Sequence, residues 1–154
     1  MQPLNLPGFA PKVIEKNGKR TIFDPVRRKY VALTPEEWVR QHFVNYLMTQ
    51  KNYPKALLAN EVLINLNGTA KRCDTVAYNC FLAPLMIVEY KAPDIHITNA
   101  VFDQIARYNM VLHVNYLTVS NGITHFCCKM DYENQTYTFL KEIPDYNMLE
   151  EKSK

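Results

Sequence analysis

Alternating apolar and polar positions follow a short proline-rich arm at the start of the chain. Residues 1–11 contain three prolines, so we expect an irregular arm there. Between Lys12 and Leu33 apolar and polar residues alternate, which is the period of a strand. Asn17-Gly18 is a hairpin turn signal, and Asp24-Pro25 marks a second turn. Residues 1–33 are therefore predicted to form an arm and an N-terminal β-hairpin or short meander.

A helical period replaces the strand period at residue 34. Thr34 can act as the N-cap, Pro35 suits the first helical position, and Glu37 has the capping-box spacing from Thr34. The helix should end before Tyr53-Pro54, because the residue preceding a proline disfavours helical backbone. Its apolar positions, three or four residues apart, are Val39, Phe43, Tyr46 and Leu47.

Three strand-like runs follow, and the third is apolar on both faces. The runs are Glu61–Leu66, Arg72–Tyr78 and Leu85–Lys91, with Asn67-Gly68 as the turn between the first two. The third run stays apolar until Glu89, which is typical of a strand in the centre of a sheet.

A second helix and further strands complete the predicted core. Thr98 or Asn99 caps the helix, whose apolar face is expected to comprise Val101, Ile105, Tyr108 and Leu112. Strands are predicted over Asn115–Ser120 and Ile123–Lys129, and Gln135–Leu140 can add an edge strand. This order indicates an α/β fold with a central mixed β-sheet flanked by helices. We expect a core domain over residues 34–143 and a loosely held C-terminal tail over residues 144–154.

Composition fits a single domain without a membrane segment. The chain has 154 residues, of which 47% are hydrophobic, enough for one core. The longest apolar run, residues 82–88, is far shorter than the roughly 20 residues of a spanning helix. The N-terminus lacks the pattern of a signal peptide. We therefore expect a cytoplasmic protein without a membrane partner.

The distribution of charge and the spacing of the cysteines and glycines indicate which ligands the chain can be expected to bind. The net charge is only +3, but seven basic residues fall between Lys12 and Lys29, where Arg27 and Arg28 are our candidates for DNA contacts. A solvated hairpin with charged edges is the alternative. The four cysteines have no zinc-ligand spacing, and the four glycines form no dinucleotide or P-loop motif. Neither zinc nor a nucleotide cofactor is expected.

Charged residues appear abruptly at the end of the predicted central strand. Glu89 and Lys91 lie two residues apart, so they point to the same face. Asp74 lies in the preceding strand, and a hairpin centred between Phe81 and Leu82 would place it beside Glu89. Two carboxylates suit Mg²⁺ or Mn²⁺, and the lysine could steady a water or the developing charge. A plain Glu89–Lys91 salt bridge, with Asp74 on a turn, is the alternative.

The residues around this set resemble a known family of enzymes. The segments that carry the resemblance are Pro35–Gln41, Tyr53-Pro54, Glu61, Lys71–Asp74, Ile87–Pro93, Gln104–Asn109 and Ser120–Gly122. In this order they resemble the PD-(D/E)XK nuclease superfamily and, more narrowly, the N-terminal nuclease domain of type I restriction enzyme R subunits. One departure is Cys73, which stands where the superfamily name has a proline.

The resemblance implies a restriction-endonuclease-like fold with a divalent-metal site at the edge of its sheet. It makes Asp74 and Glu89 metal ligands and Lys91 the catalytic lysine. Glu36 would be the third acid, with Glu37 as its competitor, and Glu36 can alternatively be a first-turn acid favoured by the helix dipole. Gln104, expected to be a buried amide, would reach the site or the DNA backbone. Further DNA contacts are expected from Arg40, Arg72 and Tyr108, with pairing to an acidic residue as the alternative for Arg72.

Two functions remain open at this point. The first is a Mg²⁺- or Mn²⁺-dependent DNA endonuclease in restriction or repair. The second is a DNA-binding or assembly module that keeps the nuclease fold and needs a partner protein or a second copy. A purely structural domain, whose charged residues form a salt bridge, is a third interpretation.

Overall fold

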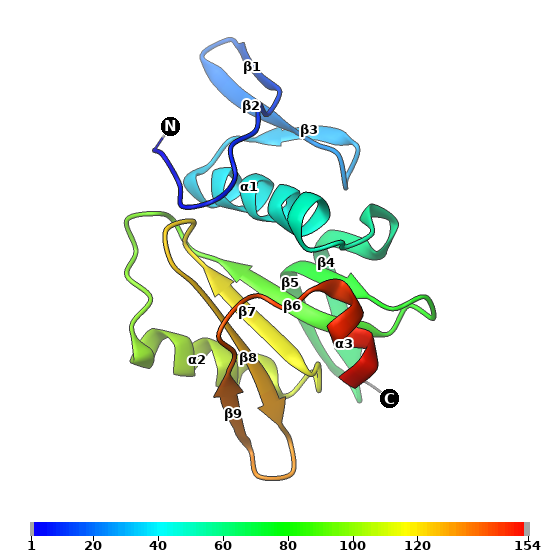
Figure 1. The fold of residues 1–154 in the computed structure, drawn as a ribbon. Coiled ribbons are helices and arrows are strands. Elements are labelled where there is room, and N and C mark those ends of the chain that lie inside the picture. The colour runs from blue at the N-terminus through cyan, green and yellow to red at the C-terminus, as the bar shows by residue number, and fades with distance from the viewer. Residues whose placement is uncertain (1, 153–154) are drawn as a thin grey trace.

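Two β-sheets and a few helices make up the structure, a computed structural model that describes residues 2–152 (Figure 1). The smaller sheet has the order β1-β2-β3, and the larger has the order β4-β5-β6-β7-β8-β9. The strands are β1 Val13–Lys16, β2 Lys19–Asp24, β3 Lys29–Ala32, β4 Leu58–Leu66, β5 Thr69–Tyr78, β6 Pro84–Tyr90, β7 Tyr116–Ser120, β8 His125–Asp131 and β9 Thr136–Phe139. The helices are α1 Pro35–Gln50, the 3-10 turn η1 Lys55–Leu57, α2 Asn99–Met110 and α3 Tyr146–Lys152.

The small sheet is the predicted meander. Asn17 and Gly18, with φ of 54° and 75°, form the first tight turn, and Arg28 takes a φ of 58° in the second. Asp24 lies fully buried before the second turn, where its carboxylate accepts hydrogen bonds from the backbone N–H groups of Val26 at 2.7 Å and Arg27 at 3.1 Å. The turn signals therefore predicted both the hairpin and its extension by a third strand.

The large sheet is mixed, as predicted. Its neighbouring strands are antiparallel except β6 and β7, which are parallel. A parallel pair needs a crossover connection, and α2 supplies it. The central position of β6 explains its apolar run, because Leu85, Met86, Ile87 and Val88 are all at most 3% exposed.

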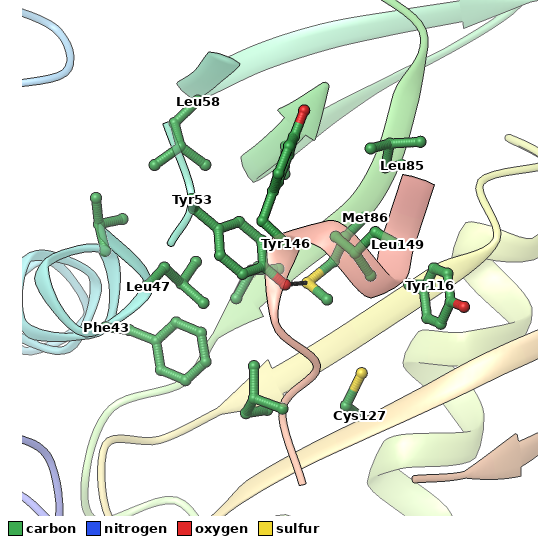
Figure 2. Packing of buried hydrophobic residues seen from close by; sticks show 14 of the residues in the cluster. Phe43, Leu47, Tyr53, Leu58, Leu85, Met86, Tyr116, Cys127, Tyr146 and Leu149 are labelled. Atoms are coloured by element: carbon green, nitrogen blue, oxygen red, sulfur yellow. Dashed lines mark hydrogen bonds between the residues drawn. The ribbon is translucent and has the colours of Figure 1, made fainter. Parts of the chain in front are cut away.

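Side chains from opposite faces of β6 enter two separate cores. Met86, Val88 and Tyr90 belong to the cluster on the α1 side, part of which is shown in Figure 2. Ile87 belongs to the cluster on the α2 side. Since residues two apart share a face, Glu89 lies on the α2 side as well.

Both helices begin at the predicted threonines. The Thr34 hydroxyl accepts a hydrogen bond from the Glu37 backbone N–H at 3.0 Å, and the Thr98 hydroxyl accepts one from Val101 at 3.2 Å. The predicted buried face of α2 is wrong in part: Phe102, Ala106 and Asn109 are the buried residues of the helix, whereas Tyr108 is 57% exposed. Two apolar stripes lie side by side on α2, and the sequence does not show which one meets the sheet.

The prediction of a loosely held C-terminal tail is wrong for residues 144–152, and residues 153–154 lie outside the described part of the chain. Tyr146 and Leu149 of α3 are buried in the α1-side core, where Tyr146 packs edge-on against Tyr53 (Figure 2). The backbone N–H of Tyr146 donates to the Lys51 carbonyl at 2.9 Å, and the Tyr53 hydroxyl donates to the Pro144 carbonyl at 2.9 Å. A helix this short carries only two core residues, too few for a clear helical period in the sequence.

The remaining predictions about the chain concern its arm, cysteines and membrane segments. The arm is irregular but docked, since the Asn5 backbone N–H donates to the Gly122 carbonyl at 2.8 Å. Cys73, Cys127 and Cys128 are buried strand residues, whereas Cys80 is exposed in the turn between β5 and β6. No helix within residues 2–152 is long and apolar enough to cross a membrane.

Candidate active site

Asp74 of β5 and Glu89 of β6 lie side by side in the large sheet, close to the point where β6 ends. The antiparallel register pairs Thr75 with Val88, so the next pair outward is Asp74 with Glu89. One Asp74 oxygen accepts a hydrogen bond from the backbone N–H of Tyr90 at 2.9 Å, which fixes that carboxyl against β6. The two carboxyl groups also share a hydrogen bond. The structure thus brings together the two acids that the sequence placed on neighbouring strands.

These two acids form an electrostatically strained pair. Burial raises the pKa of the Glu89 carboxyl well above its usual range, and the neighbouring charge and hydrogen bond of Asp74 raise it further. Lys91 opposes this shift in pKa but does not cancel it. A cation bound between the two carboxyl groups would favour the ionised form of Glu89. The donor set therefore fits a divalent metal ion.

A cavity of about 340 Å³ opens beside the pair. The cavity is lined by Asp74, Glu89 and Lys91 and by residues of α2. Lys91 follows the end of β6, where its backbone N–H donates to the Ser120 carbonyl at 2.9 Å. No ion pair within 4.0 Å joins Glu89 to Lys91 in the described part of the chain, so the plain salt-bridge interpretation is not what the structure shows.

Three further residues that were predicted to contact DNA or to take part in catalysis also line this cavity. Gln104 and Tyr108 lie one turn apart on α2, and Arg72 projects from β5. Gln104 is exposed, so the expectation of a buried amide is wrong, because Gln104 lies on the solvent-facing stripe of α2. Arg72 is exposed and donates to the Glu61 carbonyl at 3.1 Å. The Lys71 ammonium stands 3.2 Å from the centroid of the Tyr108 ring.

Arg40, expected to contact DNA, is instead buried in an ion-pair network. It is 6% exposed and binds the Glu37 carboxylate at 2.6 and 3.0 Å. It also donates to a Glu61 carboxylate oxygen at 3.0 Å and to the Asp74 carbonyl at 2.8 Å. Burial alone would lower the pKa of Arg40, but the hydrogen bonds and charge of Glu37 raise it, so the side chain stays cationic. The DNA contact predicted for Arg40 is not supported by this geometry, because most of its donors are used inside the fold.

Arg27 has a similar structural role, whereas Arg28 remains available. Arg27 pairs with Asp24 and, at 2.7 Å, with Glu37. These ion pairs tie the turn of the small sheet to α1, so the expected phosphate contact of Arg27 is not supported by its geometry. Arg28 is exposed at the tip of the same turn.

The two first-turn acids of α1 have different positions. Glu36 is exposed and lines a second cavity of about 480 Å³, which shares Asp74 and Tyr90 with the first. Glu37 is buried among Arg27, Arg40 and Gln41. Within residues 2–152 no three acidic, histidine or cysteine side chains form a group that could hold a metal ion. The structure therefore does not bring Glu36 or Glu37 together with the Asp74–Glu89 pair.

A chain of hydrogen bonds that the sequence did not predict connects the site to the small sheet. The Tyr90 hydroxyl donates to Thr75 at 2.9 Å, Thr75 donates to the Asn60 side chain at 2.7 Å, and Asn60 donates to Asp24 at 2.9 Å. Asn60 of β4 is a buried amide, and a buried amide needs hydrogen-bond partners. The chain connects the strand end that carries Glu89 to the turn of the small sheet.

We expect the ionised Asp24 and Glu37 carboxyl groups to make the stability of the fold depend on pH. Burial alone would raise the pKa of Asp24, but hydrogen bonds from Arg27 and Asn60 hold it below its ordinary value. Hydrogen bonds from Arg40, Gln41 and Arg27 likewise hold the pKa of Glu37 below its ordinary value. Carboxyl groups with a lowered folded-state pKa stabilise the fold above the unfolded pKa of about 4 and lose that effect as the pH falls below it. We expect the free energy of unfolding, measured in urea, to drop below pH 4 in the wild type. The drop should be smaller in an Asp24→Asn variant, and equal drops would contradict this role.

Comparison with protein families decides what this chain is related to. The family model of the type I restriction enzyme R protein N terminus matches residues 35–144, well over half of the chain. The chain belongs to this family. The matched residues run from α1 to just before α3, so every residue of the cavity lies inside the R-protein match.

The fold comparison agrees with the family. The structure is similar to the fragment structure of a proposed HsdR subunit of a type I restriction enzyme from Vibrio vulnificus YJ016, with a TM-score of 0.55 and 16% sequence identity. The match covers 79% of this chain and 25% of that chain, so this R-protein domain spans about a quarter of the length of that structure. Comparison with curated protein sequences gives no match.

Proposed function

We propose that this R-protein domain is a divalent-metal-dependent DNA endonuclease that hydrolyses a phosphodiester bond at the Asp74–Glu89 pair. The observation that carries the proposal is the pairing of the Asp74 and Glu89 carboxyl groups on neighbouring strands, where both line one cavity together with Lys91. Mg²⁺ or Mn²⁺ is the cofactor proposed, because hard oxygen ligands and room for water suit these ions. The proposed substrate is DNA, as expected for a restriction-related domain.

Each residue of the cavity has a role in this proposal. Asp74 and Glu89 would hold the metal ion, which when bound polarises the scissile phosphate and lowers the pKa of a coordinated water. Lys91 would donate a hydrogen bond to a phosphate oxygen and stabilise negative charge as it develops. The partial burial that raises the pKa of Glu89 also strengthens electrostatic interactions at its carboxyl group.

The exposed residues around the cavity would position the DNA backbone. Arg72 on β5 and Gln104 on α2 can donate to phosphate oxygens, and Tyr108 offers an exposed ring beside Lys71. Arg28 is a further phosphate contact on the small sheet. Arg40 and Glu37 would act indirectly, because their network holds the Asp74 backbone carbonyl in place.

A DNA-binding or assembly module that does not cleave alone is the second proposal. The observation that favours it is that no third acid joins the pair within the described residues. In that case a partner subunit or a second copy of this chain would be required for cleavage.

Incubation with supercoiled plasmid separates the two proposals. An endonuclease should nick or linearise the plasmid in Mg²⁺ or Mn²⁺ and should be inactive in EDTA. Binding without any cleavage, at several protein concentrations and with both metals, would favour the module instead.

A further inference from the structure

The small sheet has one face that takes no part in the candidate active site. Ile22 and Asp24 of β2 are fully buried and define its inner face. In Figure 1 the sheet stands at one end of the molecule, with α1 between it and the large sheet. Side chains alternate between the faces of a strand. The outer face, as we define it, comprises Lys12, Ile14, Lys16, Lys19, Phe23 and Tyr30.

The register places these side chains together on three adjacent segments. Lys16 pairs with Lys19 across the first turn, and Phe23 pairs with Tyr30. The Phe23 backbone N–H donates to the Lys12 carbonyl at 2.8 Å, and the Lys12 ammonium lies 5.6 Å from the centroid of the Phe23 ring. The outer face is therefore a continuous surface rather than a set of isolated residues.

The outer face is positively charged without compensation. It carries three lysines and no acidic residue, because Glu15 and Asp24, the acids in these strands, belong to the inner face. Glu15 stands opposite Arg20 there, and Asp24 is buried with its own partners. A surface with this charge attracts a polyanion, and the attraction does not depend on sequence.

An exposed aromatic ring, that of Tyr30, distinguishes this surface from an ordinary charged strand edge. Phe23 and Tyr30 pack edge to face with centroids 5.2 Å apart, and Tyr30 remains 42% exposed. Lysines alone would serve to keep a sheet edge soluble, but an exposed ring among them has no such use. Unpaired bases stack on aromatic side chains, while paired bases in a duplex have no free face for stacking.

We infer that the outer face binds single-stranded DNA, with its lysines on the phosphates and Tyr30, supported by Phe23, against a base. The choice of DNA over RNA rests on the proposed function. Ala32 pairs with Thr21 and therefore lies on the same side of the small sheet as the outer face. It also lines the second cavity, which shares Asp74 with the first. A strand bound on the outer face would therefore lead toward the candidate active site.

Fluorescence anisotropy with a labelled oligothymidylate of about 16 nucleotides, in EDTA, tests this inference. Binding should be tighter than to a duplex of equal length. The Lys16→Glu/Lys19→Glu variant should bind more weakly and lower the slope of log K against log salt by about 1.4, as expected for two lost contacts to single-strand phosphates. Tyr30→Ala should weaken binding about five-fold or more. Because no divalent metal is present, a failure of the proposed nuclease activity would leave these results unchanged.

Matched variants keep the test specific. Lys55→Glu/Lys141→Glu makes the same change in net charge at exposed sites elsewhere, and Phe81→Ala removes an exposed ring from another loop; both should bind as wild type does. Equal losses in the test and control variants would overturn the inference. So would a preference for duplex, binding of an oligouridylate but not the DNA strand, or binding only to vesicles of anionic lipid. Thermal melts of each variant show that the fold is retained.

Discussion

Replacing Lys91 with alanine is expected to lower the rate of plasmid cleavage by at least about 100-fold while leaving the fold intact. The estimate follows from the usual loss when one preorganised donor to a developing negative charge is removed. The side chain lines the cavity beside Glu89, and it makes no ion pair within 4.0 Å in the described chain. Its removal should therefore change the reaction far more than stability. Initial rates of nicking in Mg²⁺ measure the effect.

Lys141→Ala is the matched control for this experiment. Lys141 is exposed and distant from the cavity residues, so its loss should leave cleavage close to the wild-type rate. A Lys91→Arg variant keeps the charge but replaces a compact ammonium with a planar group, and we expect it to remain largely inactive. If Lys91→Ala cleaves as fast as wild type, the catalytic role proposed for this lysine is wrong.

Replacing Arg40 with methionine is expected to destabilise the fold by about 3–5 kcal/mol. The substitution removes one of the two arginines that bind the buried Glu37 carboxylate, and it removes the donor to the Asp74 carbonyl. A buried charge without its partner is costly, whereas replacing both partners can be nearly neutral. The double variant Arg40→Met/Glu37→Met should therefore recover part of the loss. Urea denaturation gives the free energy of unfolding for each variant.

An exposed ion pair provides the comparison. Arg107 binds Asp103 at 3.2 Å on the surface of α2, where the two side chains are 58% and 45% exposed. Arg107→Met should change stability by no more than about 1 kcal/mol. A loss for Arg40→Met as small as this would mean that Arg40 is not a structural residue, and its expected role in DNA binding would be open again.

The contrast between Arg40 and Lys91 shows what the sequence can and cannot predict. Strand periodicity predicted that Glu89 and Lys91 share a face, and the apolar run before them predicted a buried central strand, because both signals are local. The pairing of Asp74 with Glu89 followed from the length of one hairpin. Arg40, by contrast, is held by Glu61 and the Asp74 carbonyl, which lie 21 and 34 residues away.

The other differences between prediction and structure have the same cause. The face of α2 was predicted wrongly because Gln104 and Tyr108 lie on a half-apolar stripe next to the buried one. The docking of α3 depends on a surface assembled from α1 and β6, which no local pattern describes. The family resemblance rested on separate motifs and is confirmed by a match over residues 35–144. The roles of the individual site residues stay predictions.

Calorimetric titration with Mn²⁺ tests the central claim most directly. The wild type should bind one ion per chain, and Asp74→Asn and Glu89→Gln should each abolish measurable binding, since the ion would lose one of its two protein ligands. Glu133→Gln, a change at an exposed acid outside the cavity, should bind as wild type does. Mn²⁺ binding that persists in both Asp74→Asn and Glu89→Gln, or no binding to the wild type, would contradict the assignment of this pair as a metal site.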